Sequence, residues 1–142
     1  MNVFNIKNAI ELTKIRHYLY IFWAIDLHGV IFKPDFKKDG PVEFYDGAIE
    51  VLQNITMHPK CKIIIYSAVQ PHLYERYAIA FKENNIHIDY INENPECVDT
   101  MLSDFSKKIY FSILLEDKAG FEGDTDWFLI KTELQKLDEW IY

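Results

Sequence analysis

Cysteine is scarce in this sequence of 142 residues, and so are dense runs of basic residues and long apolar stretches. The two cysteines, Cys61 and Cys97, form neither a CxxC motif nor a disulfide framework, so we expect both thiols to be reduced. The longest apolar stretch, residues 18–25, falls far short of the roughly 20 residues that span a bilayer. Acidic and polar residues stand near the amino terminus where a signal peptide is apolar, which predicts a cytoplasmic protein without a membrane partner.

The charge balance argues against a nucleic-acid partner. The formal net charge is −7, and nonspecific affinity for DNA or RNA comes mostly from basic side chains on the phosphate backbone. Apolar residues are abundant, at 49% of the chain with ten Phe, nine Tyr and three Trp. This composition and length predict one domain over residues 1–142 with a substantial core.

Apolar runs and amphipathic segments alternate along the chain. Continuous apolar runs are typical of strands that are covered on both faces of a parallel sheet, and we assign strands to residues 20–25, 63–66, 86–90 and 109–115. Apolar residues at helical spacing follow Asp46, Pro71 and Thr125, and residues 1–18 predict a peripheral helix. The alternation predicts an α/β fold, a three-layer Rossmann-like parallel sheet flanked by helices on both faces.

Residues 30–45 break this alternation. Two short β-prone runs, at residues 30–32 and 42–45, flank a polar segment that contains Asp39-Gly40-Pro41. This pattern predicts a short β-hairpin flap that leaves directly after the first strand.

Polar side chains stand where three of the predicted strands end. They are Asp26, Ser67 and the pair Glu116-Asp117, while Lys107 and Lys108 come before the last strand. Ligands of open α/β sheets bind outside the carboxyl ends of the strands. Carboxylates that converge there can bind a hard divalent cation and hold a phosphoryl group against it. The sequence therefore predicts a site at this edge where a divalent cation and a phosphoryl group bind together.

These residues resemble a known family. The segment IFWAIDLHGV at residues 21–30 is similar to the first motif of the haloacid dehalogenase-like (HAD-like) hydrolases, an apolar strand followed by Asp-x-Asp-Gly-Thr/Val. Ser67, then Lys107 or Lys108, then Glu116-Asp117 follow in the order of the next three motifs, and Lys118-Ala119 continues the similarity. The resemblance covers roughly residues 20–127 and implies a HAD-like core with a minimal cap.

The resemblance also implies a role for each matching residue. Asp26 would be the nucleophile that forms an aspartyl-phosphate and a magnesium ligand, with the backbone carbonyl of His28 as a second ligand. Glu116 or Asp117 would complete the metal site. Ser67 would bind the phosphoryl group, and Lys108, favoured over Lys107 by its spacing before Glu116, would neutralise it. The implied function is a magnesium-dependent phosphohydrolase.

One residue departs from the family pattern. His28 stands where phosphatases of the family carry a second Asp, the general acid and base. A histidine can take over this role because it titrates near neutral pH; alternatively, His28 is an ordinary turn residue. The second interpretation favours a catalytically weak or inactive HAD-like binding module that recognises a phosphorylated ligand or protein partner.

Simpler interpretations stand beside the functional ones. Asp26 can cap a turn, Ser67 can bond its own backbone, and either lysine can be a solvated charge. Asp124 and Asp126 flank the predicted start of the last helix, where both can cap it. Asp124 can alternatively add a carboxylate to the metal site.

Overall fold

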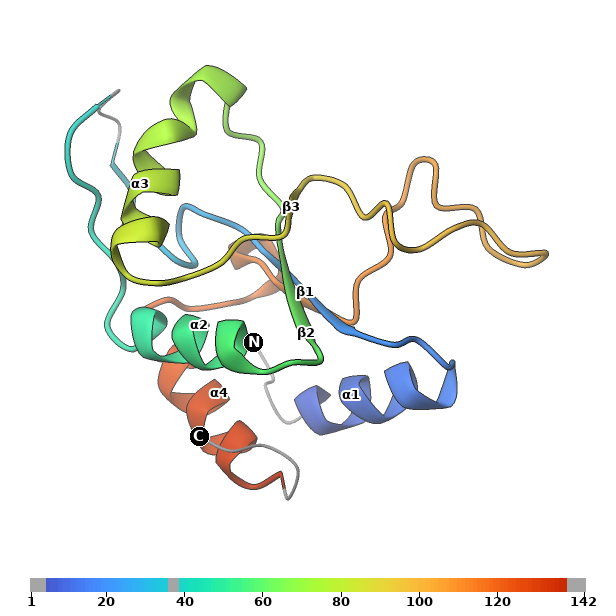
Figure 1. Cartoon of the computed structure of the whole chain (residues 1–142). Coiled ribbons are helices and arrows are strands. Elements are labelled where there is room, and N and C mark those ends of the chain that lie inside the picture. The colour runs from blue at the N-terminus through green and yellow to red at the C-terminus, as the bar shows by residue number, and fades with distance from the viewer. Residues whose placement is uncertain (1–4, 36–38, 138–142) are drawn as a thin grey trace.

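The computed structural model describes residues 5–35 and 39–137. Its four strands form one parallel sheet in the order β3-β2-β1-β4. Their bounds are Ile21–Ile25 for β1, Cys61–Ile65 for β2, Tyr90–Ile91 for β3 and Ile113–Leu115 for β4. Helices flank this sheet (Figure 1), so the chain has the expected α/β, Rossmann-like architecture.

The first strand lies inside the sheet and is buried along its whole length. Its residues are aromatic, β-branched or small, which suits a strand that packs on both faces. Ile25 pairs with Ile65 on one side and with Leu115 on the other. The carboxyl ends of β1, β2 and β4 are therefore level with one another.

The helices agree closely with the amphipathic segments of the sequence. They are α1 (Ile6–Ile15), α2 (Ala48–Met57), α3 (Glu75–Glu83) and α4 (Asp126–Gln135), with short 3₁₀ turns η2 (Pro71–Leu73) and η3 (Asp117–Ala119). The helix expected from Pro71 begins as a 3₁₀ turn, in which the N–H of Tyr74 donates to the carbonyl of Pro71. Residues 138–142, which follow the last helix of the structure, lie outside the described residues, as do residues 1–4 of the expected peripheral helix.

The expectation of helices on both faces is wrong for the described part of the chain. Trp23, Ile25 and Ile65 join the buried residues of all four helices in one core cluster. On the other face, the ring of Phe22 contacts Tyr110, whose ring stacks on Tyr18. Residues 92–112 contain no helix, and Figure 1 shows this yellow-to-orange segment across the sheet from α2 and α3. Aromatic side chains from an irregular segment thus cover the second face.

Two strands are shorter than the apolar runs that predicted them. Before β3, the Asp89 carboxylate accepts the N–H of Ile63, so a side chain replaces part of the backbone ladder. Before β4, the hydroxyl of Ser112 accepts the N–H of Phe22 in the same way. Apolar periodicity does not reveal such substitutions, because they depend on single polar residues.

The predicted hairpin is present as a minimal pairing. Phe32 and Phe44 form an isolated antiparallel bridge, supported by a hydrogen bond from the Lys33 N–H to the Glu43 carbonyl. Residues 36–38 of the flap lie outside the described residues. Across the described ranges, no helix is long and apolar enough to cross a membrane.

Candidate functional site

Asp26 follows β1 and is held by both neighbouring strands. Its N–H donates to the Leu115 carbonyl at 3.0 Å, and the Tyr66 N–H donates to the Ile25 carbonyl at 2.9 Å. A carboxylate oxygen of Asp26 accepts the N–H of Leu27 at 2.7 Å. The side chain is therefore oriented by the turn that begins immediately after the strand.

The strand order reverses next to Asp26. From β1 the chain continues to β2 and β3 on one side, and it then returns to place β4 on the other side of β1. Asp26 follows β1, and Glu116 and Asp117 follow β4. The three carboxylates thus stand on the two sides of the switch point, the usual ligand position in open α/β sheets.

The carboxylates of Asp26, Glu116 and Asp117 are close enough to share a cation. One oxygen of each lies within 4.8 Å of the others. Burial raises the pKa of Asp26, and the charge of Asp117 raises it further. Hydrogen bonds to the carboxylate, including one from Ser67, lower this pKa but do not cancel the increase. Burial and the neighbouring Asp117 also raise the pKa of Glu116. Without a cation, Asp26 and Glu116 therefore hold a proton more tightly than free carboxyl groups do.

Gly29 allows the turn after β1 to approach Asp117. Its φ of 77° lies in the left-handed region, and a Cβ added there would lie 2.8 Å from the Asp117 Oδ2 atom. A side chain at this position would be strained and would also displace the carboxylate. The glycine of the Asp-Leu-His-Gly sequence is thus required by its backbone conformation and by the short distance to Asp117.

Ser67 lies beside Asp26, as predicted, and its hydrogen bond lowers the pKa of the Asp26 carboxyl. The side chain of Asn92 holds the backbone of Ser67 with two hydrogen bonds, from the Ser67 N–H at 2.9 Å and to the Ser67 carbonyl at 2.8 Å. Sequence analysis missed Asn92. The one sequence feature that could have indicated its role is that it is an asparagine directly after a strand. In the structure it adopts a φ of 54°.

His28 is engaged by α3. Its Nε2 atom lies 2.5 Å from the hydroxyl oxygen of Tyr77, and the two rings meet edge to face. Tyr77 is buried, with 3% of its surface exposed. The structure therefore directs one ring nitrogen of His28 toward α3.

Lys108 does not lie beside the three carboxylates. It is exposed and borders a surface cavity together with Arg16 and Tyr18, which precede β1. Asp26 follows this five-residue strand, whose length is about 16 Å. The stacking of Tyr110 on Tyr18 holds the chain after Lys108 near the amino ends of the strands. The spacing of the motifs in the sequence does not predict this position of Lys108. Lys107 is exposed as well.

Tyr45, at the end of the flap, is a neighbour of the site that sequence analysis missed. An added Cβ at Gly123 would lie 2.5 Å from its ring, so the two residues pack directly together. Burial raises the pKa of Tyr45, and the charges of Asp124 and Asp117 also raise it, opposed by Lys33. An aromatic residue at a hairpin end is the only sequence signal for this contact.

Asp124 and Asp126 differ in their environment. Asp124 is exposed and does not belong to the cluster of three carboxylates found among the described residues. Asp126 is buried, and its carboxylate accepts the N–H of Glu122 at 2.9 Å. Asp126 therefore stabilises the loop that enters α4.

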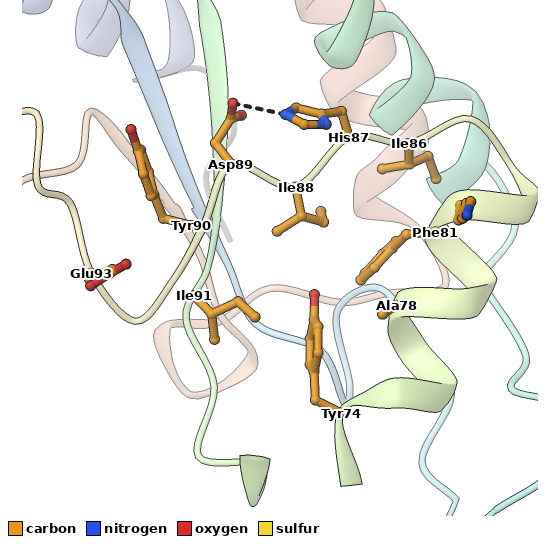
Figure 2. Close-up of a pocket in the computed structure, with 11 residues that line it drawn as sticks. Tyr74, Ala78, Phe81, Ile86, His87, Ile88, Asp89, Tyr90, Ile91 and Glu93 are labelled. Carbon is orange, nitrogen blue, oxygen red and sulfur yellow. Dashed lines mark ion pairs between the residues drawn. The ribbon is translucent and has the colours of Figure 1, made fainter. Parts of the chain in front are cut away.

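A cavity of about 520 Å³ lies apart from the carboxylates, between α3 and the edge strand β3. Its walls are mainly apolar, and Figure 2 shows the hydroxyl of Tyr74 pointing into it, with the His87–Asp89 ion pair at one end. None of the three carboxylates lines this cavity. The candidate site is thus at the sheet edge and not in this cavity.

The donor atoms of the cluster suit a hard divalent cation. Mg²⁺ binds oxygen at about 2.0–2.1 Å in an octahedron, so its ligand oxygens are about 3–4.2 Å apart. Carboxylate oxygens within 4.8 Å of one another need only small side-chain rotations, or a bridging water, to reach this geometry. Exposed acidic groups also cluster without an ion.

No protein-family model matches the chain, and neither a curated protein nor a solved structure matches it. A functional assignment therefore depends on the residues of the site themselves.

Proposed function

We propose that the chain is a magnesium-dependent phosphohydrolase that acts through an aspartyl-phosphate on Asp26. The observation that carries the proposal is the gathering of Asp26, Glu116 and Asp117 on both sides of the switch point. Three carboxylates in such close contact repel one another, and a divalent cation relieves this repulsion. The resemblance of residues 21–30 to the first HAD-like motif supports the assignment of the nucleophile to Asp26.

The proposed reaction has two steps. A carboxylate oxygen of Asp26 attacks phosphorus, the bond to the ester oxygen breaks, and the departing oxygen takes a proton from His28. A water molecule then attacks the phosphorus of the aspartyl-phosphate while His28 takes its proton, which releases inorganic phosphate and restores the carboxylate. The hydroxyl of Ser67 donates to a phosphoryl oxygen. Bound magnesium supplies positive charge that the pentavalent transition state needs.

A panel of phosphate esters, assayed with magnesium and with EDTA, tests the proposal. We expect magnesium-dependent turnover that Asp26→Asn reduces to background, because the amide cannot form the aspartyl-phosphate. The matched control is Asp104→Asn, an exposed aspartate in the segment that follows β3, which should retain activity. Magnesium-dependent turnover that survives Asp26→Asn would place the reaction elsewhere.

Two observations favour a second candidate, a HAD-like module that binds a phosphorylated ligand or protein without turnover. His28 is engaged by Tyr77, and Lys108 lies near the amino ends of the strands with Arg16. One ring nitrogen of His28 is therefore turned toward α3, and the lysine that a phosphatase uses lies away from Asp26. Calorimetric titration with a phosphoserine peptide and magnesium distinguishes the candidates, because the module binds the peptide and leaves it intact.

Replacing His28 also separates the two candidates. His28→Asp places a carboxylate two residues after the nucleophile, where proton transfer contributes about 10²–10⁴-fold to rate. We expect turnover on the ester panel to rise by up to about 100-fold, and His28→Ala to lower it. Equal, measurable rates in all three proteins would show that His28 transfers no proton.

A further inference from the structure

Two apolar surfaces of the described chain are open to solvent. One is the bend at residues 100–103, here called the apolar bend, whose Met101 and Leu102 are 103% and 97% exposed. The other is the cavity of about 520 Å³ between α3 and β3, here called the α3–β3 cavity. We propose that two copies of the chain form a two-fold dimer in which the apolar bend of each protomer fills the α3–β3 cavity of the other. The proposal depends neither on the phosphohydrolase nor on magnesium.

The apolar bend is held by its own hydrogen bonds. The N–H of Thr100 donates to the Ser103 carbonyl at 2.9 Å, and the Thr100 hydroxyl accepts the N–H groups of Leu102 and Ser103 at 3.2 and 3.0 Å. A carboxylate oxygen of Asp99 accepts the Phe105 N–H at 2.6 Å, which closes the base of the bend. Figure 1 shows this part of the yellow-to-orange segment extending away from the sheet. Large apolar side chains that are presented together to water indicate an interaction surface.

The α3–β3 cavity has an apolar centre with one unpaired polar group. Its walls include Phe81 of α3 together with Ile86 and Ile88, which precede β3 (Figure 2). The hydroxyl of Tyr74 points into the cavity and has no hydrogen-bond partner among the described residues. Burial alone raises the pKa of Tyr74 to about 12. The cavity therefore favours an apolar group that also carries a weak acceptor.

Met101 and Leu102 match the cavity in size and chemistry. A cavity of about 150 Å³ holds a benzene molecule, so a volume of about 520 Å³ accommodates both side chains. A methionine sulfur packs favourably against aromatic rings and is a weak hydrogen-bond acceptor. Met101 thus suits the ring of Phe81 and the hydroxyl of Tyr74.

Charged side chains surround both surfaces. Those that border the cavity are of both signs, namely Lys82, His87, Asp89 and Glu93. Asp99 and Asp104 are exposed on either side of the apolar bend, and in the dimer Lys82 is a cation that these carboxylates can approach. An apolar centre with a polar, solvent-accessible rim is the usual arrangement of protein–protein interfaces. This arrangement favours a protein over a small apolar molecule as the occupant of the cavity.

The positions of the two surfaces favour a second copy of this chain. The strand β3 is at the edge of the sheet, and the cavity lies between this strand and α3. The chain continues from β3 into the segment that carries the apolar bend, which lies across the sheet from α3 (Figure 1). A two-fold axis beside β3 therefore brings each bend to the cavity of the other protomer. Both contacts form at once, so assembly stops at the dimer.

Sedimentation velocity of the full chain, from about 1 μM to about 1 mM, tests the proposal. We expect a monomer–dimer equilibrium that is the same in magnesium and in EDTA. Met101→Asp with Leu102→Asp should weaken the dimer at least about 100-fold, because each protomer loses two buried apolar side chains. The matched control is Leu19→Asp with Met57→Asp, which changes the same residue types at positions that are 83% exposed and outside both surfaces. This control should dimerise like the native chain.

A mixing experiment tests whether the bend and the cavity contact each other. Ala78→Trp places a large side chain in the cavity from α3, and Ile91→Arg, at a position that is 42% exposed, is a second cavity variant. Each should be monomeric with a native circular dichroism spectrum. Mixing either one with the variant changed at Met101 and Leu102 should restore part of the association, because one intact bend then meets one intact cavity.

Three outcomes would overturn the proposal. A native chain that stays monomeric at about 1 mM would leave the two surfaces to other occupants. Association that persists in the variant changed at Met101 and Leu102, or that mixing with folded cavity variants does not restore, would place the interface elsewhere. Assemblies that grow beyond the dimer with concentration would show a contact without two-fold closure.

Discussion

At the scale of the residue, Gly29 shows how the backbone shapes the site. We expect Gly29→Ala to lower the free energy of unfolding by about 1–3 kcal/mol, because alanine is strained at positive φ, and to weaken magnesium binding, because its Cβ would displace Asp117. Urea unfolding and magnesium titration measure the two effects.

Gly40 provides the matched control for this substitution. It also has a positive φ, of 94°, but an added Cβ would have no atom within 4 Å. Gly40→Ala should therefore cost only the backbone strain and leave magnesium affinity unchanged. Equal effects of the two alanine variants on magnesium binding would show that Asp117 is not held by the close approach of Gly29.

Asp26 predicts a pH dependence of stability at the residue scale. Burial and then Asp117 raise the pKa of Asp26 in the folded chain, so the folded state holds its proton more tightly than the unfolded state, where the pKa is about 3.9. Ionisation of this carboxyl therefore lowers stability as the pH rises from about 3.9 through the raised folded value. In EDTA at pH 7, Asp26→Asn should unfold at higher urea concentration than the native chain.

In magnesium, we expect the advantage of Asp26→Asn over the native chain to be lost or reversed. Saturating magnesium should stabilise the native chain and leave Asp26→Asn unchanged, since the variant lacks one of the proposed ligands. A metal-free Asp26→Asn protein that is less stable than the native chain at pH 7 would show that the carboxylates do not repel one another at this edge.

At the scale of the element, one helix side chain holds the flap. Arg76 of α3 donates to the Asp35 carboxylate at 3.0 Å and to the carbonyls of Gly40 and Pro41. Its side chain is 7% exposed, and the bond to Asp35 is partly buried, whereas those to Gly40 and Pro41 lie at the surface. We expect Arg76→Met to cost about 1.5–3 kcal/mol and to speed amide hydrogen exchange at Lys33, whose N–H closes the flap.

An exposed ion pair within the flap is the control for Arg76. Lys33 and Glu43 approach to 2.9 Å, with side chains that are 40% and 72% exposed, and such pairs contribute about 0–1 kcal/mol. Lys33→Met should therefore change stability and exchange only slightly. If Arg76→Met had an equally small effect, the flap would be held by Phe32 and Phe44 alone.

At the scale of the whole molecule, magnesium would join two halves of the sheet edge. Asp26 follows β1, whereas Glu116 and Asp117 come from the far end of the chain after β4. A ligand at 100 times its Kd stabilises the folded state by about 2.7 kcal/mol, or roughly 10 °C in melting temperature for a chain of this size. Calorimetry with magnesium should show this increase, and Asp26→Asn with Asp117→Asn should abolish it. An equal increase in the double variant would place the cation elsewhere.

Local sequence determined much of the sheet and its polar edge. A continuous apolar run predicts a buried strand because both of its faces must be covered, and residues 21–25 are such a strand. Carboxyl ends of parallel strands meet at one edge, which explains why Asp26, Ser67 and the pair Glu116-Asp117 lie together. Periodicity and strand direction are properties of consecutive residues, and a single sequence contains them.

Tertiary structure alone decided the partners of the remaining site residues. Lys108 lies near the amino ends of the strands because Tyr110 stacks on Tyr18, which stands far earlier in the chain. His28 meets Tyr77 only because the crossover after β2 packs α3 over the turn that follows β1. Side chains that are distant in sequence compete for the same space during packing, and neither spacing nor composition records which of them prevails.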